Sequence, residues 1–132
     1  MDDKARKFLK SNHSTIMVTL KQDGTPHVAR VDVGLVGDKL QSSGTESRVR
    51  TKHLRRDPRT VLCVLDNENP YAWLGIEAEA TILDGPDAPE RNLALYRAIA
   101  GEPEDLDEYL GAMRAEGRLV YEFDAKRTYG PY

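Results

Sequence analysis

A cluster of cations lies in the middle of an otherwise acidic sequence. The 132-residue chain has a formal net charge of -3 and contains 19 lysines and arginines. A local excess of positive charge in a negatively charged protein predicts an anionic partner. Arginine holds phosphate through paired hydrogen bonds, so a phosphate-bearing ligand is the partner that this cluster favours. Nearly a third of the basic residues lie between residues 42 and 59: Arg48, Arg50, Lys52, Arg55, Arg56 and Arg59.

The local sequence predicts that a strand end and a helix position these cations. Residues 42–45, Ser-Ser-Gly-Thr, are expected to end a strand, and a helix is expected from Glu46 or Ser47 to Arg56. Asp57-Pro58 ends it, because the residue before proline is disfavoured in helical geometry. Free N–H groups at such a helix start favour phosphate. A solvated basic helix is the other interpretation, and a site that uses both Arg48 and Arg50 needs one of them in the loop or first turn.

Other chemistries find less support in the sequence. The three histidines, His13, His27 and His53, form no i, i+4 pair, and no metalloprotease, nucleotide-binding or serine-hydrolase motif occurs. No metal site is predicted, and no catalytic residue can be named. Arg30 interrupts an apolar strand and must reach either solvent or an anion. Tyr71 and Trp73, at the start of another strand, could stack on a planar ring or pack in the core.

Composition predicts one domain that spans residues 1–132. No apolar run is long enough to cross a bilayer and the first residues do not resemble a signal peptide, so no membrane partner is expected. The single cysteine, Cys63, excludes a disulfide framework and a cysteine-based zinc site, which favours a reducing cytoplasm. The acidic net charge argues against nucleic-acid binding through the basic helix.

Hydrophobic periodicity predicts six or so antiparallel strands with helices inserted between them, and residues 71–83 alternate between an apolar face and a face that carries Glu77 and Glu79. Asp23-Gly24 is typical of a hairpin turn, and Pro26 of a strand start. Asp87, with Glu90 three residues later, predicts a helix cap of the capping-box type. The fold class is therefore mainly β, a small barrel with inserted helices. The expected strands are 16–20, 25–36, 39–43, 60–65, 71–83 and 119–123, and the expected helices are 2–10, 46–56, 89–100 and a segment around 109–113.

The run from residue 42 to residue 59 resembles the signature region of flavin-type split β-barrel proteins. The similarity is greatest to the branch that uses the deazaflavin coenzyme F420, which is related to pyridoxamine 5'-phosphate oxidase. It rests on the segment His53-Leu54-Arg55-Arg56-Asp57-Pro58-Arg59, on the hairpin Asp23-Gly24-Thr25-Pro26-His27-Val28, and on the C-terminal helical pair and the ending Tyr129-Gly130.

The resemblance implies a homodimeric six- or seven-stranded split barrel with the coenzyme at the subunit interface. It implies that Ser43, Arg48 and Arg50 hold the coenzyme phosphate and that Lys52 assists. It places His27 and Arg30 beside the ring or its side chain, and Tyr71 and Trp73 at the interface. His27 and Arg30 face opposite ways on a regular strand, so a bulge is needed if both contribute. His53, which stands where the family has Asn, is also expected among the cofactor-binding residues. Ala78 stands where the family has Gly, and Arg50 where it has Lys.

The resemblance therefore implies an oxidoreductase that transfers a hydride between reduced F420 and an unsaturated organic acceptor, and we expect it in the cytoplasm. The acceptor, a small molecule, is not identified by the sequence. Two alternatives stay open at this point: an FMN-binding oxidase or reductase of the pyridoxamine phosphate oxidase type, and an F420 carrier without turnover. The acidic oligoglutamate tail of F420, which FMN lacks, suits the additional cations Lys52 and Arg56.

Overall fold

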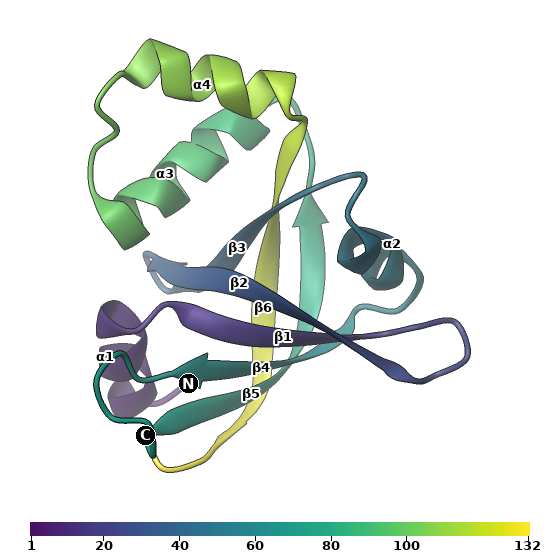
Figure 1. The fold of residues 1–132 in the computed structure, drawn as a ribbon, viewed down its shortest axis with the longest axis vertical. Helices are drawn as coiled ribbons and strands as arrows, with labels where there is room; N and C mark the ends of the chain where they lie inside the picture. The colour runs from purple at the N-terminus through teal and green to yellow at the C-terminus, as the bar shows by residue number, and fades with distance from the viewer.

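Six antiparallel strands close into a barrel in the computed structural model, which describes residues 1–132 (Figure 1). Around the barrel the strands follow the order β1-β2-β3-β6-β5-β4, and β1 pairs with β4 to close it. This confirms the mainly β fold with inserted helices and sets the strand number at six. The strands are β1 (Ser14–Leu20), β2 (Pro26–Val36), β3 (Lys39–Thr45), β4 (Arg59–Leu65), β5 (Trp73–Leu83) and β6 (Arg118–Tyr129).

The apolar core fills the barrel, because alternate residues of each strand point inward. In β1 the inward residues Thr15, Met17 and Thr19 are buried while their neighbours are only half-buried. Strand β5 shows the predicted alternation, with Leu74, Ile76, Ala78 and Ala80 on the buried face. The core is therefore assembled from side chains of all six strands: Met17, Val31, Val33, Leu40, Leu62, Val64, Leu74, Ile76, Leu119, Tyr121 and Phe123.

Four helices surround the barrel: α1 (Asp3–Ser11), α2 (Val49–Arg56), α3 (Ala88–Ala100) and α4 (Leu106–Ala115). Helices α3 and α4 form a pair over β2, β3 and β6, and Figure 1 shows this pair standing apart from α1 and α2. Gly34 allows α3 to lie directly on β2, since a Cβ at that position would come within 2.8 Å of Ile99 Cγ1. None of the four helices is both long and apolar enough to cross a lipid bilayer.

Three details differ from the sequence-based expectations. Helix α2 begins at Val49, because Glu46 and Ser47 form a turn and Arg48, in extended conformation, is the N-cap. Asp87 is the N-cap of α3, but its carboxylate accepts from Arg91 Nε at 3.0 Å and caps no backbone N–H, so the predicted capping interaction is wrong. Strand β6 continues to Tyr129, because it goes on pairing with β5 beyond Phe123, with a register shift opposite Glu77 and Ala78.

The start of α2 is fastened to the barrel through Tyr121 of β6. The Thr51 hydroxyl hydrogen-bonds to the Tyr121 hydroxyl and donates to the Thr45 carbonyl at 2.7 Å. Tyr121 is fully buried and passes over β3 at Gly44, where a Cβ would lie 2.8 Å from the ring carbon Cε2 and overlap the hydroxyl. Burial raises the pKa of Tyr121, which keeps the phenol protonated. The hydrogen bond between Tyr121 and Thr51 therefore requires a glycine at position 44 of β3.

The last turn of α2 is held at the end of the barrel by His53. This imidazole is 8% exposed, and its Nδ1 lies 2.8 Å from the hydroxyl of Thr19 in β1. The His27 ring packs edge-on against it, with the ring centroids 5.2 Å apart. Burial, the charge of His27 and the charge of Arg56 lower the pKa of His53. The folded protein therefore favours the neutral imidazole at this position.

We expect Gly44→Ala to destabilise the fold by about 1–3 kcal/mol, since the added methyl group forces Tyr121 or β3 to move. Urea denaturation followed by circular dichroism measures this. Gly111→Ala in α4 is the matched control, because its Cβ meets no atom within 4 Å and alanine favours a helix. Equal midpoints for Gly44→Ala and wild type would refute the role of Gly44.

We expect stability to fall as the pH drops below about 6.5, the ordinary histidine pKa, through the contribution of His53. The sign follows from the lowered pKa: the unfolded chain takes up the proton at a higher pH than the folded chain does. The unfolding midpoints of wild type and His53→Asn, measured at a series of pH values on both sides of about 6.5, test this contribution of His53. The variant should lose less stability than wild type on acidification, and parallel pH profiles would contradict the assignment.

Candidate functional site

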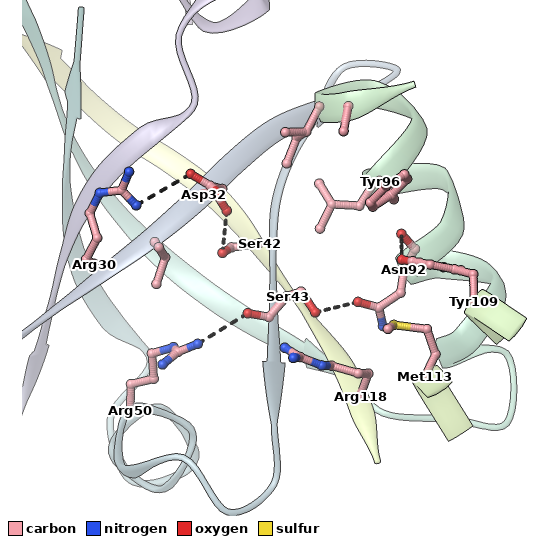
Figure 2. Close-up of a pocket in the computed structure, with 14 residues that line it drawn as sticks. Arg30, Asp32, Ser42, Ser43, Arg50, Asn92, Tyr96, Tyr109, Met113 and Arg118 are labelled. Atoms are coloured by element: carbon pink, nitrogen blue, oxygen red, sulfur yellow. Dashed lines mark hydrogen bonds and ion pairs between the residues drawn. The ribbon is translucent and has the colours of Figure 1, made fainter. Parts of the chain in front are cut away.

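A cavity of about 460 Å³ opens between the barrel wall and the α3–α4 pair. Its floor comes from β2, β3 and β6, one side from α2, and its opposite wall from the two helices (Figure 2). It thus lies where the basic segment and the C-terminal helical pair meet. The polar residues that line it are Arg30, Asp32, Ser42, Ser43, Arg50, Asn92, Tyr109 and Arg118.

Two guanidinium groups lie in this cavity with hydrogen-bonding capacity unused. The Arg50 side chain donates from Nη2 to the Ser43 carbonyl at 3.4 Å, and its Cζ lies 5.7 Å from the centroid of the Tyr121 ring. Arg118 Nη2 contacts a carboxylate oxygen of the exposed Glu116 at 3.5 Å. The Nε atoms of Arg50 and Arg118 are buried and have no partner, and no other buried side-chain nitrogen or oxygen in the chain lacks one.

Buried polar atoms are normally satisfied, so two orphaned donors in one cavity point to a missing acceptor. Figure 2 shows the Arg50 and Arg118 side chains extending toward Ser43 from opposite sides. The start of α2 has further donors without a partner, since Arg48 provides no side-chain cap and the backbone N–H groups of Val49 and Arg50 make no hydrogen bond. Of these three residues, Arg50 lines the cavity. This corner of the cavity is therefore suited to an anion.

A hydrogen-bonded chain of three residues forms the boundary between floor and helical wall. The Ser43 hydroxyl donates to Asn92 Oδ1 at 2.5 Å, and Asn92 Nδ2 donates to the carbonyl oxygens of Ala88 and Leu119 at 3.0 and 3.4 Å. Tyr109 donates to the Asn92 carbonyl at 3.0 Å, and burial raises the Tyr109 pKa. Asn92 is 2% exposed. These bonds fix β3, α3 and α4 against one another at the site.

The helical wall itself is mostly apolar. Tyr96 stacks at a tilt on Tyr109, with centroids 5.0 Å apart. Leu95, Ile99 and Met113 complete this wall. A cavity with cations at one end and an apolar wall at the other suits a ligand that joins an anionic group to an apolar ring system.

Three of the sequence-predicted site residues line the cavity: Arg30, Ser43 and Arg50. Arg30 lies at the rim, 58% exposed, with Nη1 3.7 Å from a carboxylate oxygen of Asp32. Arg48 and Lys52 are exposed on α2 and do not line it.

The other four predicted residues lie away from the cavity. Strand β2 pairs with β1 without a register shift, so no bulge brings His27 to the face of Arg30. His27 and His53 instead contact each other at the end of the barrel. Tyr71 precedes β5 and is 83% exposed, while Trp73 packs edge-on against Tyr129. A single chain therefore does not bring these four residues to the anion-binding corner.

Five polar residues of the cavity lie outside the sequence-based set: Asp32, Ser42, Asn92, Tyr109 and Arg118. A signal existed for Arg118, which is a cation placed directly before the predicted strand 119–123. The signal for Asn92 is weaker: it is a polar residue with apolar residues one helical turn away on either side, Ala88 and Tyr96. The sequence gives no signal for Tyr109 beyond its place in a predicted helix.

Two arginines of the basic run are neutralised by carboxylates. Arg55 pairs with Glu46 at 2.8 Å and with Asp84 at 2.7 Å. Arg59 pairs with Asp57 at 2.8 Å and lowers the pKa of that carboxyl to about 2. Arg48, Arg50, Lys52 and Arg56 have no carboxylate within 4.0 Å, so the positive charge available to a ligand comes from these four residues.

Comparison with known proteins agrees with this architecture. The family model described as pyridoxamine 5'-phosphate oxidase matches residues 1–130. A conserved hypothetical protein of Mycobacterium tuberculosis superposes with a TM-score of 0.80 at 20% identity, over 97% of this chain and 82% of that one. An F420 reductase superposes with a TM-score of 0.76 at 18% identity, over 98% of both chains.

A Listeria innocua protein provisionally named as a pyridoxamine 5'-phosphate oxidase gives a TM-score of 0.71 at 17% identity, over 96% of this chain and 94% of that one. At these identities the superpositions establish a common fold. The family model covers nearly the whole sequence, and the chain therefore belongs to the pyridoxamine 5'-phosphate oxidase family of split β-barrel proteins.

Proposed function

We propose that this chain is an oxidoreductase that binds coenzyme F420 and transfers a hydride between the reduced coenzyme and an unsaturated organic acceptor. The observation that carries the proposal is the buried, unpartnered Nε of Arg50 at the start of α2, inside a cavity that also has an apolar wall. Membership of a family that includes oxidoreductases supports the reaction class, and the fold shared with an F420 reductase supports the choice of coenzyme.

The residues of the cavity fit such a group. Arg50, assisted by the free N–H groups of α2 and by Arg48, would hold its phosphate. The apolar side chains of α3 and α4 would shield its ring system from water. When bound, the coenzyme supplies the hydride chemistry, while the protein supplies orientation and electrostatic stabilisation.

The free cations of α2 favour F420 over FMN. Lys52 and Arg56 are four residues apart on one exposed face of the helix. Arg48, also exposed, precedes the helix as its N-cap, and these three cations form the α2 row. None of them pairs with a carboxylate, and Arg56 also donates to the Leu20 carbonyl at 2.7 Å. This row leads away from the phosphate corner and suits the acidic oligoglutamate tail, which FMN lacks.

Two alternatives are decided by experiment. An FMN-dependent oxidase or reductase would use the same phosphate corner without the α2 row. A carrier would bind F420 and leave the reduced coenzyme unoxidised across a broad panel of electron-poor acceptors. Turnover of reduced F420 with at least one acceptor, followed by its absorbance, separates the enzyme from the carrier.

We also propose that the protein acts in the cytoplasm as a homodimer. Val28, Leu65 and Tyr71 are apolar or aromatic and 64%, 38% and 83% exposed, which leaves surface for a second subunit to cover. In such a dimer Tyr71 and Trp73 of one subunit could reach the coenzyme of the other. Sedimentation equilibrium tests this, since a monomer at micromolar concentration would refute it.

We expect Arg50→Ala to weaken F420 binding by about 10- to 100-fold, because a charged hydrogen bond to phosphate contributes about 1.5–3 kcal/mol. Coenzyme fluorescence in a titration of wild type and variant measures it, with FMN titrated in parallel. Arg91→Ala is the matched control, since Arg91 is exposed, lies outside this cavity and pairs with Asp87. Tight FMN binding without F420 binding would reverse the choice of coenzyme, and binding of neither would end the proposal.

We expect Lys52→Glu to weaken F420 binding by about threefold or more at low salt, while FMN binding stays unchanged. The reason is that only F420 presents carboxylates to the exposed face of α2. Lys10→Glu on α1 makes the same charge change at another exposed position. An equal loss for both coenzymes, or no loss for F420, would show that the tail does not follow this row.

A further inference from the structure

We propose that Arg118 and Arg50 together form the anion clamp of this site, and that Ser43 does not donate to the anion. The inference rests on the proposed function for the identity of the ligand, and it specifies how the phosphate is held. The clamp would take a tetrahedral oxyanion whose oxygens carry no proton, as in a phosphodiester.

The orientation of Asn92 decides the role of Ser43. Asn92 Nδ2 faces the carbonyl oxygens of Ala88 and Leu119, and both of these can only accept. The amide oxygen must therefore point to Ser43, whose hydroxyl donates its one proton to it at 2.5 Å. With that proton committed, Ser43 can only accept a hydrogen bond. An unprotonated phosphate oxygen is also only an acceptor, so the two cannot bond while this arrangement holds.

Arg118 supplies the donor that Ser43 does not. It begins β6 and pairs across the sheet with Thr45, at the end of β3 that leads into α2. Its side chain is 25% exposed, and its buried Nε has no partner. The contact of Nη2 with Glu116, which is 48% exposed, leaves Nε free. Arg118 and Arg50 thus line the same cavity, and each has a buried Nε without a hydrogen-bond partner. Their side chains approach Ser43 from two different elements, β6 and α2 (Figure 2).

The charges on the two sides of Arg118 favour the inner cavity. Arg118 also borders a second hollow, walled by Glu46, Arg55 and Asp84. There the carboxylates of Glu46 and Asp84 balance Arg55 and Arg114, so this lining adds no net positive charge to that of Arg118. On the inner side, Arg50 adds a positive charge that no carboxylate pairs with. An anion held by Arg118 therefore lies on the side of Arg50.

The arginine Nε–H resonances of 15N-labelled protein, recorded during a sulfate titration, test this directly. Sulfate is the probe because it is tetrahedral, doubly charged and without a proton. We expect the resonances of Arg50 and Arg118, assigned through Arg50→Lys and Arg118→Lys, to shift with one common dissociation constant. The Nε–H of Arg91, which donates to Asp87 at 3.0 Å, is the internal control and should not shift.

Two variants complete the test, each checked for an unchanged fold by circular dichroism. Arg118→Lys keeps the charge but loses Nε, and we expect about tenfold weaker sulfate binding. Ser43→Ala should stay within about threefold of wild type, because the Ser43 hydroxyl makes no donor bond to the anion. Arg118→Gln serves as a second variant if the lysine variant does not fold.

Each outcome separates this inference from the proposed function. A shift of Arg50 without Arg118, a larger loss in Ser43→Ala than in Arg118→Lys, or no sulfate binding by wild type overturns the clamp. F420 binding that depends on Arg50 would survive any of these results and keep the proposed function. Sulfate binding that depends on Arg118, with no binding of F420 or FMN, supports the clamp and overturns the coenzyme assignment.

Discussion

The site depends on the attachment of the first turn of α2 to the barrel. Tyr121 crosses β3 at a glycine, and its hydroxyl meets Thr51, which also bonds back to the Thr45 carbonyl. The same ring lies beside the guanidinium of Arg50. An unsatisfied buried donor costs about 1–3 kcal/mol, so the unpartnered Nε of Arg50 carries a free-energy cost that a bound acceptor would offset. Stability and ligand binding are therefore linked at one turn of the chain.

Geometry, rather than composition, decides which cations of the basic run can bind a ligand. Arg55 is held by Glu46 and Asp84, nine and 29 residues away, and Arg59 by its near neighbour Asp57. Exposed ion pairs of this kind add little stability. Their effect is that Arg55 and Arg59 no longer offer a free positive charge to a ligand. The remaining positive potential is concentrated on the α2 row and inside the cavity.

Local sequence signals predicted the order and kind of the elements. The alternation in β5, the Asp23-Gly24 turn and the stop at Asp57-Pro58 depend on neighbouring residues, and the structure has all three. Contacts between distant residues were not predictable in this way. Ser43 meets Asn92 across 49 residues, and Arg118 joins the site only because β6 pairs with β3. The cap at Asp87 failed for a local reason, because Arg91, four residues later, pairs with the carboxylate.

The two walls of the cavity have different physical origins, which divides their roles. The cationic corner is made by the barrel and α2, whose positions follow from strand pairing and from the Tyr121 attachment. The apolar wall comes from α3 and α4, which pack on the outside of the barrel with Gly34 set against Ile99. Changes in that wall would alter the shape of the cavity without disturbing strand pairing in the barrel. Affinity for the anion therefore belongs to the barrel and α2, whereas discrimination between ring systems and acceptors belongs to the helical pair.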